Sequence, residues 1–411
     1  MRFLGRLFGR KEPAERDEDR FARRVLEAVH AAYADIRLAY DRDGFELRHV
    51  DPAATGQRTF LANSFAEYCR LETDERDQHI ANVVNFIGES RKPAPTGEDA
   101  LDMLLPVVRS RADLLAVCAM QGGDFAYARA SRPFCQTMLV MLAIDTPAAI
   151  RLVTDDDLDD LGLTFDDALG IAVAHLDERG SHSFGQLGEG TFVTTCGDHY
   201  DASRILIPDF FTQLPVKGHP VAIVQARSAV LVTGSEDEEG LAMIAGFALE
   251  DFDQNERAVA LSPIELVDGQ WRPFGILPHH PQALRNLVPH QLAWAYNATQ
   301  QAVQTMLGED IYVASALMVD QDGRNATAAT WAAGVPTACP LVDALIIAED
   351  GEFEQLTRSL DDVLKVCGPF AEVTAFPHPP RWLLPARMTP EQRADLTNNY
   401  PEHAFFAASA G

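Results

Sequence analysis

The stretch Asp198-His199-Tyr200-Asp201-Ala202-Ser203-Arg204-Ile205-Leu206 marks a change of pattern near the middle of the chain. The run before it, from Thr191 to Thr195, is β-branched and aromatic, which is typical of a strand. Asp201 stands where a helix N-cap would accept backbone N–H groups. Pro208 lacks an N–H and crowds the preceding turn, so we expect two short helices or a kink before Pro215. The sequence therefore predicts a corner at which a strand passes into a helix.

The composition limits the class of protein. At 411 residues the chain exceeds the usual size of one hydrophobic core, which predicts two or three domains. Acidic residues outnumber basic ones, 61 to 34, and the resulting net charge of −27 repels the phosphates of nucleic acid. Six cysteines occur without a C-x-x-C pair, a pattern that suits free thiols in a reducing cytosol. We expect a cytoplasmic protein that does not bind nucleic acid.

Linker-like composition predicts three domains. Apolar residues at helical spacing, among them Phe21, Val25 and Val29, predict a long helix from Glu15 to about Tyr40 within a helical N-terminal subdomain at 12–90, which a Pro-rich linker follows. Strand and helix patterns alternate over a central domain at 98–277, in which the apolar run Leu114–Ala119 is expected to be a strand. A smaller α+β domain is expected at 283–385, and the helical stretch Gln282–Leu307 that leads into it is expected to be interrupted at Pro289. Both chain ends, 1–11 and 386–411, are expected to be flexible tails, the second with one short helix from Thr389 onward.

The first tail carries four basic residues around two pairs of apolar ones. At most, this composition indicates weak contact of residues 1–11 with a membrane surface. No apolar run reaches the roughly 18 residues that a membrane-spanning helix needs.

Three Asp-Gly pairs indicate the type of sheet. They occur at Asp43-Gly44, Asp268-Gly269 and Asp322-Gly323, and Asp-Gly between apolar runs is typical of tight β-hairpins. Hairpins join antiparallel strands. The predicted fold class is therefore α+β, with a central mixed or antiparallel sheet rather than a doubly wound parallel one.

The aspartate-rich segment 155–166 resembles a calcium-binding loop in the spacing of its carboxylates. Its sixth position is Asp160, however, where the sharp turn of such a loop requires glycine. Two helix starts explain the segment better, with Thr154 and Thr164 as N-caps and Gly162 ending the first helix. We expect no metal and no cofactor.

Three motifs together resemble the YtpQ family of conserved bacterial proteins. They are LPVVRS at Leu105–Ser110, YDASRIL at Tyr200–Leu206 and VTGS at Val232–Ser235. The resemblance covers about residues 100 to 277, and longer relatives also look similar outside this range. It implies a conserved cytoplasmic fold and supplies no catalytic residue.

The corner contains the residue types of a hydrolytic triad in His199, Asp201 and Ser203. Ser203 would lie in the first turn of a helix, without the G-x-S-x-G elbow that exposes a nucleophile. Asp201 is already explained as a cap. We therefore expect no catalytic residues here and favour a non-enzymatic binding or scaffold protein.

Candidate ligand-binding residues are Arg109, Arg132 and Arg204, together with Asp201. Guanidinium groups at the ends of strands and helices could hold a carboxylate or phosphate bidentately. Alternatively, Arg109 and Arg204 pair with Asp201 or other acids and lock the corner. A pocket lined by these arginines would favour a small-anion binding protein or an unrecognised enzyme, whereas direct Arg–Asp contacts would favour a structural role.

Overall fold

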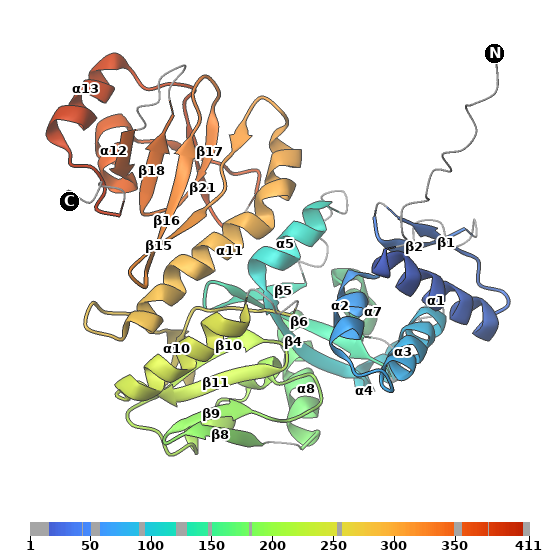
Figure 1. Cartoon of the computed structure of the whole chain (residues 1–411). Coiled ribbons are helices and arrows are strands. Elements are labelled where there is room, and N and C mark those ends of the chain that lie inside the picture. Colours follow the sequence, from blue (N-terminus) through green and yellow to red (C-terminus); the bar gives the residue numbers. More distant parts are fainter. Residues whose placement is uncertain are drawn as a thin grey trace, which may run out of the picture. The chain divides into compact units, whose positions relative to one another are not determined.

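The computed structural model describes residues 16–42, 44–50, 58–89, 95–120, 130–146, 150–180, 183–252, 257–348, 356–376 and 378–405. The expectations for residues 1–11 concern a segment outside this part. Helices occur together with antiparallel and mixed sheets, which confirms the α+β class (Figure 1). Within the described residues, no helix combines the length and the apolar character needed to cross a membrane.

The chain divides into two compact units, residues 1–103 with 144–151 and residues 104–143 with 152–411. The predicted ranges 98–277 and 283–385 therefore both lie largely in the second unit. We describe each unit by itself.

The first unit combines helices with a small sheet. Its elements are α1 (Asp17–Ala32), α2 (Ala62–Arg70), α3 (Arg76–Glu89), α4 (Gly97–Asp102) and an antiparallel sheet of β1 (Leu38–Asp41), β2 (Glu46–His49) and β3 (Arg58–Phe60). The predicted stripe of Phe21, Val25 and Val29 is buried along α1. The helix was expected to continue to about residue 40, but it ends at Ala32. The chain then enters β1, where Leu38 packs into the same core.

The second unit contains the remaining sheets. One has the order β4-β6-β5, from β4 (Leu104–Ser110), β6 (Met138–Asp145, whose last two residues belong to the first unit) and β5 (Ser131–Phe134). Strand β7 (Ile150–Leu152) follows β6 in the chain.

A six-stranded sheet has the order β13-β12-β10-β11-β9-β8, from β13 (Gln270–Pro273), β12 (Ile264–Val267), β10 (Pro220–Ala226), β11 (Ala229–Gly234), β9 (Thr191–Thr194) and β8 (Phe184–Gly188). All its neighbouring strands are antiparallel, as the Asp-Gly turns predicted.

Two further sheets lie toward the C-terminus. Their orders are β14-β17-β21-β20, from β14 (Tyr312–Val313), β17 (Thr337–Pro340), β21 (Arg381–Leu384) and β20 (Ala371–Glu372), and β15-β16-β18-β19, from β15 (Leu317–Gln321), β16 (Arg324–Trp331), β18 (Ala344–Ile347) and β19 (Leu356–Ser359). Both are mixed, because β14 pairs with β17 and β16 with β18 in parallel.

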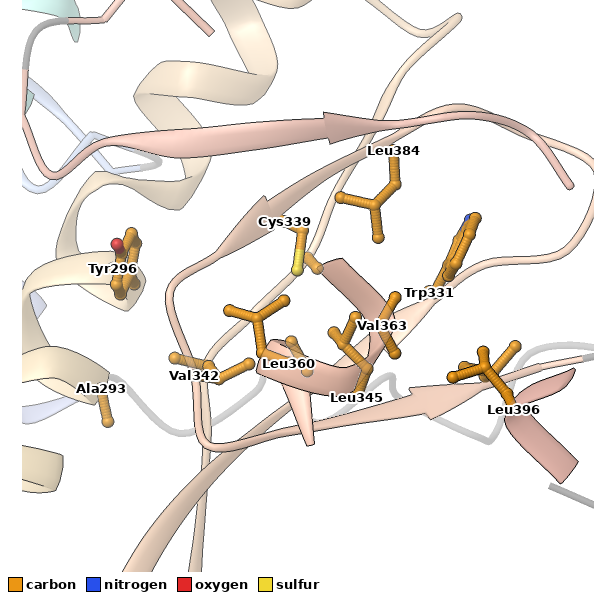
Figure 2. Close-up of a cluster of buried hydrophobic side chains, with 14 residues drawn as sticks. Ala293, Tyr296, Trp331, Cys339, Val342, Leu345, Leu360, Val363, Leu384 and Leu396 are labelled. Carbon is orange, nitrogen blue, oxygen red and sulfur yellow. The ribbon is translucent and has the colours of Figure 1, made fainter. Parts of the chain in front are cut away.

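The second unit also contains helices. They are α5 (Arg111–Met120), α7 (Asp155–Leu161), α8 (Phe165–Glu178), the 3-10 helix η2 (Ala202–Leu206), α9 (Pro208–Thr212), α10 (Glu238–Phe252), α11 (Gln282–Leu307), α12 (Leu360–Cys367) and α13 (Pro390–Asn399). Helix α11 runs through without the interruption expected at Pro289. It contributes Leu287 to the core under α10, Tyr296 to the C-terminal core shown in Figure 2, and Val303 to a cluster with α5. This shared helix joins the two predicted domains in one unit.

The predicted turns and caps agree with the structure in detail. The residues Asp268, Gly269, Asp322 and Gly323 all have positive φ between 50° and 75°, as the hairpin turns between β12 and β13 and between β15 and β16 require. Asp43 lies outside the described residues.

The aspartate-rich segment forms two capped helices, not a calcium loop. Thr154 and Asp157 make a reciprocal capping box at α7, and Gly162 ends that helix at φ 66°. Thr164 accepts the N–H of Asp167 at the start of α8.

Two expectations were wrong. The apolar run Leu114–Ala119 was expected to be a strand but lies in α5, where the hydroxyl of Ser110 accepts the N–H of Asp113 at the first turn. The range 386–411 was expected to be a flexible tail with one short helix from Thr389 onward. The helix is present as α13, but its Leu396 is fully buried in the C-terminal core, so α13 is packed against the protein. A short apolar run does not distinguish a buried helix from a strand, which explains the first error.

Candidate functional site

The central corner is held by a buried ion pair. Arg204 Nη1 donates to Asp198 Oδ1 at 2.9 Å, and Nη2 donates to Oδ2 at 2.8 Å. The Arg204 side chain is fully buried, whereas that of Asp198 keeps 23% of its exposure. The backbone N–H of Tyr200 also donates to Asp198 Oδ1. Arg204 is thus engaged bidentately by an acid from its own corner, and of the acids that the sequence left open as its partner the structure selects Asp198 and not Asp201.

Asp201 does not cap the following helix, which corrects the prediction. Its backbone is helical, with φ −52° and ψ −49°, and its side chain makes no cap hydrogen bond. Instead, its Oδ1 accepts the N–H of Cys196 at 3.0 Å. The carboxylate therefore points back toward the end of the preceding strand and closes the turn. Pro208 begins α9 directly after η2, which confirms the prediction of two short helices.

The 3-10 helix η2 ties two sheets together. The Ser203 hydroxyl accepts the N–H of Val108 on β4 at 3.3 Å. The N–H of Ala202 donates to the carbonyl of Arg227, in the turn between β10 and β11, at 3.1 Å. Because Ser203 is only 1% exposed and already engaged, its environment differs from that of an exposed nucleophile. The corner joins β4 to the six-stranded sheet.

The ion pair sets the charge state of Asp198. Burial raises the pKa of this carboxyl group, but the hydrogen bonds from Arg204 and from the Tyr200 N–H outweigh burial. The net result is a pKa below the ordinary value. The same pairing raises the pKa of Arg204 against the opposing effect of burial. Both shifts favour the charged pair, as expected for a structural lock.

Arg109 lies with other arginines and not with Arg204. It belongs to β4, while Arg227 lies in the β10–β11 turn and Arg257 precedes β12. The N–H of Arg227 donates to the carbonyl of Arg257 at 3.0 Å, which brings these two residues together. Arg109 interacts electrostatically with both. We call Arg109, Arg227 and Arg257 the arginine cluster.

The arginine cluster concentrates positive charge in a desolvated place. Burial, followed by the charge of Arg227, lowers the pKa of Arg109 to about 9. Burial also lowers the pKa of Arg227. All three arginines nevertheless keep intermediate exposure. Because these groups are desolvated but still partly exposed, an anion beside them would meet less competing water than at a fully exposed arginine.

One carboxylate, Asp113, interacts with Arg109 and Arg227. Burial raises the pKa of Asp113 despite these two neighbouring positive charges. Arg227 Nε is buried and has no hydrogen-bond partner within the described part of the chain. Arg109 and Arg227 thus both interact with the carboxylate of Asp113, and within the described residues Arg227 Nε remains as a donor for a further acceptor.

Arg132, the remaining candidate, lies apart from both groups. Its guanidinium carbon lies 4.4 Å from the ring centre of Phe165, and its Nε lies 3.8 Å from Asp166 Oδ1. These contacts hold it beside the start of α8. The predicted site residues therefore separate into the Asp198–Arg204 corner, the arginine cluster and this surface contact.

Sequence reasoning missed Arg227 and Arg257. Neither belongs to a motif, and they are more than a hundred residues from Arg109. Their one shared sequence signal is basic charge in an acidic chain, and Arg227 also lies in a short turn between two apolar strands.

Comparison of the chain with protein-family models, with curated proteins and with solved structures finds no match. The resemblance to the YtpQ family therefore rests on the sequence motifs.

Proposed function

We propose that this chain is a cytoplasmic, non-enzymatic binding protein that holds a small anion, a phosphate or a carboxylate, at the arginine cluster. The observation that supports this function is the gathering of Arg109, Arg227 and Arg257, in which the partly exposed Arg109 and Arg227 are desolvated, interact with each other and also interact with the carboxylate of Asp113. Like charges that repel one another, at groups that burial has desolvated, raise the free energy of the empty site. An anion would offset that cost.

The chemistry of the cluster suits oxyanions. Guanidinium groups present planar pairs of donors that match the oxygens of a carboxylate or a phosphate. Arg227 Nε supplies a buried donor without a partner in the described residues. We infer no bond-making step, because Ser203 is buried and engaged by Val108. Reversible binding is the function that these contacts favour.

The cluster also connects with the motifs of the sequence. Arg109 belongs to LPVVRS, and the YDASRIL stretch holds the Arg227 backbone through the N–H of Ala202. We propose that the domain is of the YtpQ type and that its corner positions the arginines. In this view Arg204 is structural and Arg109 and Arg227 bind the ligand.

Isothermal titration calorimetry with inorganic phosphate and with acetate tests this function. One of the two anions should bind the wild type, and Arg227→Gln should weaken that binding about tenfold or more, since hydrogen bonds to charged groups contribute about 1.5–3 kcal/mol. Arg272→Gln is the matched control, because Arg272 pairs with Glu265 at an exposed position. The backbone contacts of Arg227 survive the substitution, so the fold should be kept.

Thermal melts of the empty protein add a second readout. Removing one of three like charges should leave the melting temperature of Arg227→Gln unchanged or higher. Equal affinity of wild type and Arg227→Gln for both anions, or no binding by the wild type at millimolar concentrations, would refute the proposal and favour the scaffold alternative.

A further inference from the structure

Strand β15 lies at one end of its four-stranded sheet (Figure 1). Within the described residues it pairs with β16 alone, in a regular ladder that runs from Leu317 opposite Ala328 to Gln321 opposite Arg324. Its apolar residues Leu317 and Met318 are 45% and 37% exposed. A regular edge strand with exposed apolar surface is a template for a further strand.

Other edge strands of the second unit carry features that discourage such pairing. β8 has a bulge between Gln186 and Gly188, and β13 contains Pro273, which lacks an N–H. β14 and β20 have two residues each, too few for a stable ladder. On β19, the carbonyl of Thr357 accepts the N–H of His403 at 3.2 Å. β15 contains no proline, no lysine and no bulge, so it lacks these protections.

Alternate residues of β15 direct their backbone groups away from β16. The turn at Asp322-Gly323 is closed by Gln321 and Arg324, which form a hydrogen-bonded pair in a two-residue hairpin. Hydrogen-bonded and outward-facing residues alternate along each strand of an antiparallel pair. The N–H and C=O groups of Met318 and Asp320 therefore point outward.

The contacts of Ala316, just before β15, agree with this alternation. Its N–H donates to Asn297 Oδ1 at 3.0 Å, and Asn297 Nδ2 donates to its carbonyl at 2.9 Å. Because Asn297 belongs to α11, the backbone of Ala316 also faces away from β16, and both its groups are satisfied. Among the described residues, none supplies a comparable partner for the outward groups of Met318 and Asp320.

We propose that two copies of this chain associate through β15, which pairs antiparallel with β15 of the other copy about a two-fold axis at Val319. Met318 of each copy lies opposite Asp320 of the other. Each of these two pairs exchanges two N–H···O hydrogen bonds, which satisfies the outward backbone groups. The sheets of the two copies become one continuous sheet, and the two-fold axis closes the assembly at a dimer.

Charge and capping select this register. Asp320 is the one charged residue of β15, and a shift by one step toward the turn would place it opposite Asp320 of the other copy, where like charges repel. A shift the other way would place Asp320 opposite Ala316, whose backbone groups Asn297 already engages. Only the register about Val319 pairs both outward residues without either conflict. The strand is thus complementary to itself, which assigns a second copy as the partner.

Sedimentation velocity of the full chain tests the association. The wild type should shift from monomer to dimer as its concentration rises from about 1 to about 100 µM. The dimer should be stronger in about 0.5 M than in about 0.1 M sodium chloride, because salt screens the repulsion between two chains of net charge −27. A wild type that stays monomeric over this range at both salt concentrations would overturn the proposal.

Two substitutions at one exposed position test the register. Met318→Glu places a second acid opposite Asp320 in both symmetric pairs and should raise the dissociation constant of the dimer about tenfold. Met318→Lys places a base there and should leave the dimer as strong as wild type or stronger. Both introduce a long charged side chain at the same site, so a difference between them reports the facing charge and not loss of folding. Equal dissociation constants of the two variants would contradict the pairing.

A charge swap and a matched control complete the test. Asp320→Lys added to Met318→Glu restores opposite charges across the axis and should recover most of the lost affinity. Leu187→Glu on the bulged edge strand β8 alters a residue that is also 37% exposed and should leave the dimer unchanged. No recovery in the double variant, or an equal loss in Leu187→Glu, would refute association through β15.

Discussion

Arg204 donates from both terminal nitrogens to the two carboxylate oxygens of Asp198, at 2.9 and 2.8 Å, from a fully buried side chain. These two hydrogen bonds occupy the Arg204 donors that a bound anion would otherwise need. They therefore assign a structural role to Arg204, while Arg109 interacts electrostatically with two other arginines, Arg227 and Arg257. The sequence does not distinguish the roles of Arg204 and Arg109. In the structure, substitution of Arg204 should lower stability, whereas substitution in the arginine cluster should weaken anion binding.

The first prediction concerns the ion pair. Arg204→Ala should lower the free energy of unfolding by about 3 kcal/mol, because it leaves Asp198 without its buried partner. This loss is at the lower end of the range for broken buried ion pairs, because water reaches part of the Asp198 side chain. Urea denaturation measures the loss. Arg272→Ala, which breaks an exposed pair with Glu265, should cost less than about 1 kcal/mol. Similar losses in the two variants would contradict the assignment.

The second prediction is the pH dependence of the same pair. The pKa of Asp198 is lowered in the folded state, so its stabilisation is present above its unfolded value of about 4. It is lost as the pH falls through the folded-state pKa. Asp198→Asn should be less stable than wild type at pH 6 to 7, and the difference should shrink below about pH 4. A difference in urea midpoint that stays constant down to pH 3 would rule this out.

Local sequence signals predicted several parts of the structure. Caps at Thr154 and Thr164, the turns at Asp268-Gly269 and Asp322-Gly323, and the break at Pro208 each depend on a few neighbouring residues. Such features follow from backbone geometry and short-range hydrogen bonds, which the sequence displays directly.

Long-range contacts could not be predicted in the same way. Asp201 has the sequence position of an N-cap, but its carboxylate turns back to Cys196 because the corner must close against the preceding strand. Arg227 meets Arg109 only because η2 binds the β10–β11 turn through Ala202. Of the arginine cluster, the sequence therefore predicted only Arg109. Arg227 and Arg257 became evident as members only from the fold.

A third prediction tests the close approach at the start of α10. A Cβ atom on Gly240 would lie 2.1 Å from Thr233 Oγ1, so Gly240→Ala should destabilise the protein by about 1–3 kcal/mol. Gly246→Ala in the same helix is the control, since nothing lies within 4 Å of its Cβ position. It should be neutral or stabilising by up to about 1 kcal/mol. Thermal melts in which both variants behave alike would show that the approach at Gly240 is not tight.

The fourth prediction concerns α13, which lies in the expected tail. Leu396 is fully buried in the C-terminal core, so Leu396→Ala should cost about 2–4 kcal/mol in urea denaturation. Leu317→Ala on β15 removes a side chain that is 45% exposed and should cost less than about 1 kcal/mol. If Leu396→Ala had no larger effect than Leu317→Ala, α13 would not be part of the core.

Anion binding at the arginine cluster is most directly tested by a crystal structure of the protein soaked with tungstate, a heavy analogue of phosphate. Anomalous scattering locates tungsten without reference to a starting structure. We predict a peak within hydrogen-bond reach of at least two of the guanidinium groups of Arg109, Arg227 and Arg257, and its disappearance in Arg227→Gln. A well-ordered cluster with no tungsten beside it, in crystals that bind tungstate elsewhere, would contradict the proposed function.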